Sequence, residues 1–286
     1  MIDNNINELE NFALKCREDI IKMSARGGCF IGASLSCVDL IVYLYKKLFI
    51  LKDIELQSNN RDYFILSKGH DVPAWYSVLA NLGIIELKRL ENHCSINDNI
   101  YWHPNISMPG VEFHSGSLGH GISIAMGMAY YHKINKMNNK IVVMLGDGEL
   151  NEGSVWEGFL VASAKNLNNL VAIIDRNEFQ ANLKTEDLIP LEPIEDKIKS
   201  FGWDVQRING HKYDEIDRAF SNISNSNSNN PSAIIADTVR GKGLPSIERD
   251  PSRWFVHFTD DEVIQLINEL HGEKAASLDS NKLFVR

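Results

Sequence analysis

Two oxygen-bearing side chains stand directly after two apolar runs of the chain. Asp147 lies in a Gly-Asp-Gly turn that ends the run 141–145, and Asn177 follows the run 170–174. Neighbouring parallel strands present their carboxyl ends at one ligand-binding edge, so we expect Asp147 and Asn177 to lie side by side. Carboxylate and amide oxygens suit Mg²⁺, and glycine N–H groups can approach phosphate oxygens. This spacing favours a magnesium and phosphate site, although Gly-Asp-Gly alone is equally typical of a tight turn.

The residues around this pair extend the pattern into a longer signature. The segment 146–180, GDGELNEGSVWEGFLVASAKNLNNLVAIIDRNEFQ, resembles the thiamine-diphosphate signature, in which Asn follows GDG about thirty residues later. Its GDGE, N-E-G and second Glu resemble the transketolase family more narrowly. Three further segments agree in family order: SKGH at 67–70, YWHPNISMPGVEFHSGSLGHG at 101–121 and ADTVRGKG at 236–243.

The resemblance implies a role for each matching residue. Mg²⁺ would be bound by the side chains of Asp147 and Asn177 and by the backbone carbonyl of Phe179. The reaction would use His103 near the reactive carbon of the cofactor, His70 at its diphosphate, and Glu152 at a subunit interface that couples two active sites. The residues expected to bind thiamine diphosphate are His70, Gly116, Ser117, Leu118, Gly146, Asp147, Gly148, Glu149, Asn177 and His257.

Several of these residues also have an ordinary structural explanation. His103 precedes Pro104 and fits a loop, and His70 could cap the helix that follows it. Glu152 and Glu157 could form a solvated helix face, because acids near a helix start favour the dipole. The alignment of His257 is loose, since the family has a Trp-His-Gly element where this chain reads Trp-Phe-Val-His-Phe. His114 and His120 are interpreted as peripheral.

One position departs from the family in a way that concerns the substrate. Members carry a Gly-His-Pro-Gly-Gly-Ser type segment whose His touches a sugar hydroxyl, and here Phe30 stands at the His position. Phe cannot donate a hydrogen bond, and a site that lacks a polar contact loses the discrimination it provides. We therefore expect a donor that is less polar than an ordinary ketose phosphate, or one that is bound differently.

The elements that must position these residues alternate along the chain. Strands are predicted at 62–66, 141–145, 170–174 and 233–236, and helices at 9–24, 36–48, 73–82, 118–134 and 152–165. This alternation predicts an α/β fold with a parallel sheet, and the resemblance implies the thiamine-diphosphate-binding fold, with helices on both faces of the sheet. We expect a single diphosphate-binding domain over 1–286, in which the polar segment 221–231 forms a surface loop.

Composition excludes several functional classes. The 286 residues carry a net charge of −9 and no Lys/Arg run, which argues against a nucleic-acid partner. The most apolar stretch, 37–51, contains Asp39, Lys46 and Lys47 and is too short to span a membrane. The acidic, polar N-terminus does not resemble a targeting signal, so we expect a cytoplasmic location. The four cysteines show no CxxC spacing and are interpreted as reduced thiols rather than a zinc site.

Together these features predict one half of a split enzyme. Transketolases are far longer, and the resemblance covers only their first domain, so we expect a separate pyrimidine-binding subunit, self-association and an α₂β₂ assembly. The expected reaction is transfer of a two-carbon ketol unit from a ketose to an aldehyde, with thiamine diphosphate and Mg²⁺. The alternatives are another thiamine-diphosphate enzyme subunit, using a pyruvate-type donor or tailoring a sugar by C–C bond formation, and a non-catalytic cofactor-binding subunit. The residues do not identify the donor or the acceptor.

Overall fold

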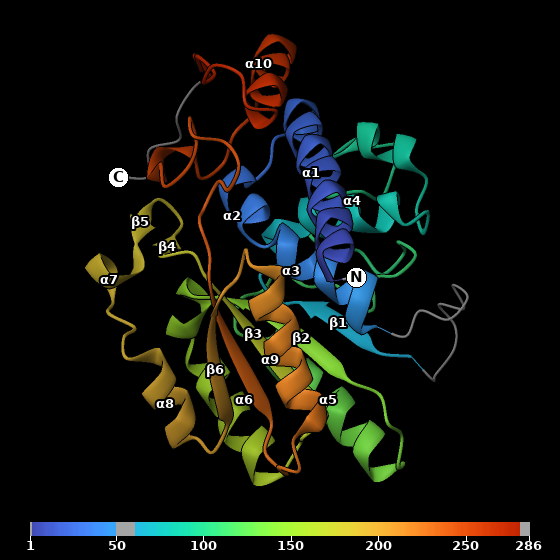
Figure 1. Ribbon diagram of the computed structural model, residues 1–286, viewed down its shortest axis with the longest axis vertical. Helices are drawn as coiled ribbons and strands as arrows, with labels where there is room; N and C mark the ends of the chain where they lie inside the picture. Colours follow the sequence, from blue (N-terminus) through green and yellow to red (C-terminus); the bar gives the residue numbers. More distant parts are fainter. Residues whose placement is uncertain (1, 50–60, 281–286) are drawn as a thin grey trace.

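A five-stranded parallel sheet forms the centre of the protein (Figure 1). The structure is a computed structural model that describes residues 2–49 and 61–280. The strand order is β1–β2–β3–β7–β6, and the bounds are Tyr63–Leu66 for β1, Ile141–Gly146 for β2, Leu170–Arg176 for β3, Asp204–Asn209 for β6 and Ser232–Asp237 for β7. The predicted parallel α/β sheet is confirmed.

The central strands follow from their apolar runs, and the edge strand does not. All seven residues of β3 are buried, as expected for a strand that is covered on both faces. In contrast, β6 is a half-exposed edge strand that contains Asp204, Gln206, Arg207 and Asn209. It was absent from the predicted strands, because its sequence has no continuous apolar run.

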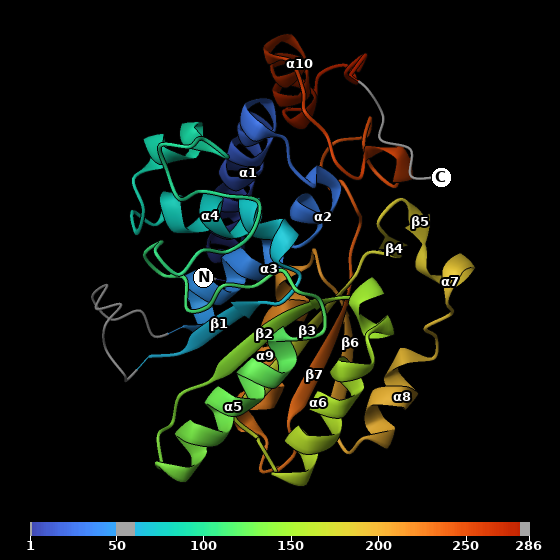
Figure 2. The same cartoon turned by 180° about the vertical axis from the view of Figure 1, so that it is seen from behind.

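Helices cover both faces of the sheet. Those on one face are α5, α6 and α8, which pack on the outward side chains of Val143, Leu145 and Ala172. The opposite face carries α9, with α1 to α4 and α10 continuing the same core (Figures 1 and 2). The helix bounds are Ile2–Gly27 for α1, Ile31–Ser36 for α2, Val38–Tyr43 for α3, Val72–Asn81 for α4, Gly121–Ile134 for α5, Gly153–Ala164 for α6, Thr185–Leu188 for α7, Ile194–Ser200 for α8, Tyr213–Asn225 for α9 and Asp260–Leu270 for α10.

Shorter elements complete the chain. A π-helical turn spans Leu44–Leu48, a small antiparallel pair joins β4 (Phe179–Gln180) to β5 (Leu183–Lys184), and single 3₁₀ turns span Gly69–Asp71, Leu87–Asn92, Gly148–Asn151 and Pro251–Arg253. Across the described ranges, no helix combines the length and the apolar character that a membrane span requires.

Three predicted boundaries need correction. The helix expected at 36–48 is interrupted at Cys37, and the helix expected at 118–134 begins only at Gly121. The predicted surface loop 221–231 is wrong in its first half, because α9 continues to Asn225. The amphipathic face of α9 explains this extension: Phe220 is buried, and Ile223 packs on the core despite its polar neighbours.

Candidate functional site

A pocket lies at the carboxyl edge of the sheet, beyond the ends of β1, β2 and β3. It brings together residues from segments that are far apart in the chain. Its lining consists of Ala33, Lys68, His70, Asp71, Leu118, Gly146, Asp147, Gly148, Glu149, Asn177, Phe179, Gln180, Ala181, Arg240 and Trp254. We call it the edge pocket. Eight of the residues singled out from the sequence line it, and the expected meeting of Asp147 with Asn177 is confirmed.

Asp147 is buried directly beyond β2, and its carboxylate is held by the surrounding backbone. Its Oδ1 accepts the N–H of Gly148 at 2.7 Å, and its Oδ2 accepts the N–H of Glu178 at 2.7 Å. Arg176 donates to Oδ2 at 2.9 Å. Burial raises the pKa of Asp147 to about 6, although Arg176 acts in the opposite direction. The carboxylate is therefore fixed in place by three donors.

The turn after β3 supplies the other expected metal ligands. Asn177 is buried, its amide nitrogen donates to Asp175 at 3.0 Å, and its oxygen accepts the N–H of Phe179 at 3.0 Å. Glu178 between them has φ of 73°, a left-handed conformation that is uncommon for a non-glycine residue and concentrates at functional sites. The turn thus places an amide oxygen and a backbone carbonyl next to Asp147, which is a donor set that suits Mg²⁺.

Glu149 lines the pocket but is used for internal support. Its carboxylate accepts the hydroxyl of Ser67, the N–H of Gly119 at 2.8 Å and the N–H of Gly146 at 3.1 Å. It is buried, and burial raises its pKa. Glu149 therefore ties three segments of the pocket wall together.

A buried ion network beneath the pocket was not predicted from the sequence. The ammonium of Lys68 lies 2.5 Å from Asp175 and 2.6 Å from Asp71, and all three residues are buried. Asp175 also accepts the hydroxyl of Ser36 at 2.6 Å and that of Thr238. Buried charges need such partners, so this network fixes the ends of β1, β3 and β7 relative to each other.

Arg240 is the second feature that was not predicted from the sequence. Its side chain is 2% exposed and lines the pocket. One nitrogen donates to the carbonyl of Ala181, whereas Nε and Nη2 are buried with no hydrogen-bond partner among the described residues. Burial lowers the pKa of Arg240 to about 10. A buried guanidinium with free donors is costly, so it points to an anionic ligand in this pocket.

His70 lies against an aromatic wall. Its ring packs edge-on against Phe30, with ring centroids 5.2 Å apart. Phe30 in turn contacts Trp254 at 5.2 Å and Phe255 at 5.1 Å. Burial lowers the pKa of His70, although Asp71 favours its charged form. The position expected to hold a hydrogen-bonding residue is therefore occupied by an apolar ring between His70 and Trp254.

His103 lines an adjacent pocket, together with Cys94, Tyr101, Trp102, Pro104, Asn105, His114 and Ser115. The two pockets meet at Gly116, which has φ of 128° and lies so close that an added Cβ would sit 2.3 Å from the His103 ring. Burial lowers the pKa of His103. Gly116 and the exposed Ser117 thus link the His103 pocket to Leu118 in the edge pocket. His114, interpreted from the sequence as peripheral, lines the His103 pocket.

Two predicted residues are not brought to either pocket. Glu152 is exposed at the start of α6, beside Gly119. His257 is exposed, and its Nε2 lies 3.2 Å from the carbonyl of Ala25. Trp254 lines the edge pocket in that part of the chain. The contact predicted between His257 and the cofactor stays a prediction, and so does the interface role of Glu152.

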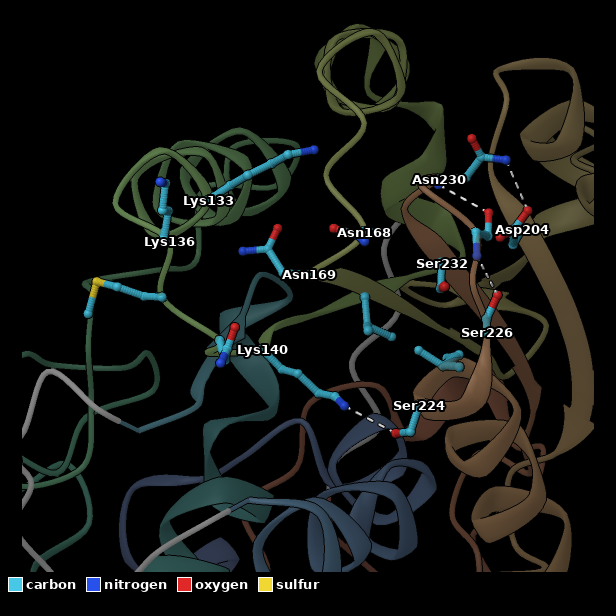
Figure 3. A pocket seen from close by; sticks show the side chains of 15 residues that line it. Lys133, Lys136, Lys140, Asn168, Asn169, Asp204, Ser224, Ser226, Asn230 and Ser232 are labelled. Carbon is cyan, nitrogen blue, oxygen red and sulfur yellow. Dashed lines mark hydrogen bonds between the residues drawn. The ribbon is translucent and has the colours of Figure 1, made fainter.

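Another pocket, at the amino edge of the sheet, contains none of the predicted site residues (Figure 3). Its three labelled lysines come from the end of α5 and the segment that follows it. Lys133 donates to the carbonyls of Lys165, at 3.3 Å, and of Asn166, which follow the last turn of α6. Lys140 donates to Ser224 on α9 at 3.1 Å. Cations stabilise helix C-termini, so these lysines have a structural role at the helix ends.

Comparison with known protein families assigns the chain to a described group. The model for the family described as "Transketolase, thiamine diphosphate binding domain" matches residues 16–278. One of the two subunits of the apulose-4-phosphate transketolase of Phocaeicola vulgatus is 36% identical over 245 residues, which cover 85% of this chain and 86% of that protein. The 6-deoxy-6-sulfo-D-fructose transketolase subunit of a Clostridium species is 33% identical over 255 residues, covering 86% and 89%.

Solved structures show the same fold in longer proteins. The transketolase of Campylobacter jejuni superimposes with a TM-score of 0.80 at 28% identity, covering 92% of this chain and 43% of that one. The transketolase of Leishmania mexicana has a TM-score of 0.84 at 23% identity, which supports the fold alone. The chain therefore spans less than half of these solved proteins.

Proposed function

The chain belongs to the transketolase family, as a thiamine-diphosphate-binding subunit of the transferase type, and from this premise we propose how its site works. It would transfer a two-carbon ketol unit from a ketose to an aldehyde, using thiamine diphosphate and Mg²⁺, together with a separate pyrimidine-binding subunit. The observation that carries the proposal is the edge pocket, where Asp147, Asn177 and Phe179 lie with the unpaired guanidinium of Arg240.

The residues of the edge pocket fit both the metal and the diphosphate. Asp147, Asn177 and the carbonyl of Phe179 form an oxygen donor set of the kind that Mg²⁺ prefers with phosphate ligands. Arg240 offers two buried donors without partners, which match an anionic group. The N–H of Gly148, expected at the diphosphate, donates to Asp147 in this structure. We therefore propose Arg240 as a principal diphosphate contact, with His70 beside it.

The chain's own residues would bind and orient the reactants. When bound, thiamine diphosphate supplies the nucleophilic carbon and the electron sink for breaking and forming the C–C bond. Burial lowers the pKa of His70 and of His103, so at pH 7 both rings are neutral and can donate or accept a hydrogen bond. His103 would face the substrate. We assign no residue of this chain to activation of the aminopyrimidine, which we place on the partner subunit.

The assembly proposal rests on the outer surface of α5 and α6. The exposed side chains of Tyr130, Tyr131, Ile134, Leu160 and Val161 form what we call the α5–α6 face, and the two helices lie side by side in front of the sheet in Figure 2. Apolar patches of this kind mark interfaces. We propose that this face contributes to self-association in an α₂β₂ assembly and that Glu152, exposed at the start of α6, lies near the interface. The cytoplasmic location and the single domain over 1–286 stay predictions.

The substrate is proposed to be an unusual sugar. The two curated relatives described above are named for apulose 4-phosphate and for 6-deoxy-6-sulfo-D-fructose, neither of which is an ordinary ketose phosphate. In this chain, Phe30 lies between His70 and Trp254. This apolar contact supports a donor that lacks a hydroxyl at the position facing Phe30.

The experiment that tests the function is reconstitution. The full chain would be combined with a pyrimidine-binding subunit encoded beside it, thiamine diphosphate and Mg²⁺, and two-carbon transfer from ketose donors to aldoses would be measured. We expect turnover with both subunits and none with either alone. Failure of the reconstituted pair to bind thiamine diphosphate in calorimetry would contradict the proposal.

A further inference from the structure

The loop that carries Arg240 is anchored from outside the edge pocket. Residues 238–243 follow β7, and the N–H of Val239 donates to Nε2 of His211 at 2.8 Å. At the other end of the loop, Arg17 donates from Nε to the carbonyl of Lys242 at 3.3 Å. Two side chains from distant parts of the sequence therefore hold the backbone on either side of Arg240.

The hydrogen bonds of His211 define its tautomer. Because Nε2 accepts the N–H of Val239, this nitrogen carries no proton. The other nitrogen, Nδ1, lies 2.7 Å from a carboxylate oxygen of Asp39 and must therefore be the donor. His211 is a neutral ring with a fixed orientation, and the carboxylate fixes that orientation.

Asp39 organises both anchors. It is 5% exposed, and it accepts two hydrogen bonds from Arg17, at 3.1 Å and 2.7 Å, in addition to the bond from His211. The hydroxyl of Tyr213 lies 3.3 Å from the same carboxylate. One buried carboxylate thus orients the two groups that reach the loop, and neither group lines the edge pocket.

Arg240 depends on this support because its own side chain has few bonds. One of its nitrogens is bonded to Ala181, and two have no partner among residues 2–49 and 61–280. The side chain lies against Gly32, where an added Cβ would be 2.8 Å from Nε of Arg240. Its placement is therefore set mainly by the backbone of the loop and by the space that Gly32 leaves.

We propose that His211 is a positioning residue, oriented by Asp39, which holds Arg240 toward the anionic end of the cofactor through the N–H of Val239. The inference rests on the proposed function, because it takes the diphosphate as the ligand of Arg240. His211 itself would touch neither cofactor nor substrate. A wrong orientation of this ring would therefore weaken cofactor binding from a distance.

The first test needs no cofactor. Hydrogen–deuterium exchange of the segment 238–243 would be measured in the full chain and in His211→Phe, which removes the acceptor and keeps a ring. We expect exchange in this segment to rise about 10-fold, since Val239 loses its partner, while exchange in β7 stays unchanged. His211→Gln, whose amide has both an acceptor and a donor, should restore most of the protection. Unchanged exchange in His211→Phe would overturn the proposal.

The second test measures ligand binding in the same variants. With Mg²⁺ present, calorimetry with thiamine diphosphate and with inorganic pyrophosphate should show dissociation constants raised about 10-fold in His211→Phe and near wild type in His211→Gln. The matched control is His271→Ala, because His271 also pairs with a carboxylate, Glu18 at 2.9 Å, but is exposed and far from the loop in sequence. Loop exchange that rises with no change in either affinity would also overturn the proposal.

The two tests separate this inference from the proposed function. If the wild-type chain binds neither probe, even with the partner subunit, the proposed function fails, whatever the loop does. If the wild-type chain binds both probes and His211→Phe binds them equally well, the proposed function stands and the positioning role of His211 fails.

Discussion

At the scale of single residues, Asp147 carries the metal site. Replacing it with Asn keeps the shape and removes the charge, while Arg176 loses its ion pair at 2.9 Å. We expect Mg²⁺-dependent affinity for thiamine diphosphate to fall by about 100-fold or more, because removing even an outer partner of a metal ligand costs 10- to 100-fold. Calorimetry with the reconstituted pair measures this. Asp237→Asn is the matched control, since Asp237 is an exposed strand-end carboxylate that is paired with Arg207. Equal affinity in wild type and Asp147→Asn would refute the assignment.

Phe30 is the residue for which we expect a gain of activity. Its ring occupies the place where the family has a hydrogen-bonding His, in contact with His70 and Trp254. We expect the reconstituted wild type to use xylulose 5-phosphate poorly and Phe30→His to use it about 10- to 100-fold better, because a hydrogen bond to a charged or strongly polar group contributes about 1.5–3 kcal/mol. Phe30→Leu, which offers no donor, should show no gain. Wild-type turnover of this ketose as fast as any other donor would mean that Phe30 does not determine specificity.

The residues of the edge pocket divide into those that a sequence can reveal and those that it cannot. Asp147 and Asn177 were predictable, because each follows an apolar run that had to be a buried strand. Arg240 lies inside ADTVRGKG, a segment that resembles the family, but its role depends on two donors that lack partners. Lys68 lies in SKGH, and its pairing with Asp175 joins residues 107 positions apart. Such pairings follow from the packing of side chains, which spacing alone does not determine.

At the scale of elements, the N-terminus of α10 depends on one carboxylate. Thr259 and Glu262 form a capping box, and Glu262 also accepts the N–H groups of Asp279 and Ser280. Although burial would raise its pKa, the hydroxyl of Ser280 and these N–H groups lower the pKa of Glu262 to about 2 from the usual 4.5. Its stabilisation is therefore complete above about pH 5 and is lost as the pH falls toward 2.

The corresponding variant is Glu262→Gln. We expect it to lower the free energy of unfolding at pH 7 by roughly 2–3 kcal/mol, since it removes a cap and a buried carboxylate with several donors. We also expect a shallower loss of stability between pH 5 and about 2 than in wild type. Chemical denaturation at several pH values measures both effects, and Asp261→Asn, on the exposed side of the same turn, is the control. Parallel pH profiles for wild type and Glu262→Gln would contradict this interpretation.

The same scale shows why some elements were predicted and others were not. Strands β2, β3 and β7 have continuous apolar runs, which identify buried parallel strands. In contrast, β6 alternates and lies at an edge, so its sequence is also typical of a loop. The helix α10 was not among the predicted helices, although the Thr-x-x-Glu signature of a capping box is visible at 259–262.

At the scale of the whole molecule, the α5–α6 face tests the assembly. Leu160 is 58% exposed on α6, and we expect Leu160→Glu to shift the protein toward smaller species in light scattering, because a buried charge opposes association. The matched control is Ile264→Glu on α10, where an apolar side chain is also 58% exposed. A wild-type chain that stays monomeric with and without its partner subunit would contradict the proposed assembly. An unchanged assembly in Leu160→Glu would exclude this face from the interface.

The edge pocket also has a consequence for how the protein is made. Its lining begins at Ala33 and ends at Trp254, with contributions from most of the chain between them. During synthesis on the ribosome, strand β7 and the loop that carries Arg240 emerge after every other wall except Trp254. A nascent chain therefore has no complete pocket until translation is nearly finished. Cofactor loading should accordingly follow release of the polypeptide, so thiamine starvation would leave full-length apoprotein to accumulate rather than arrest folding midway.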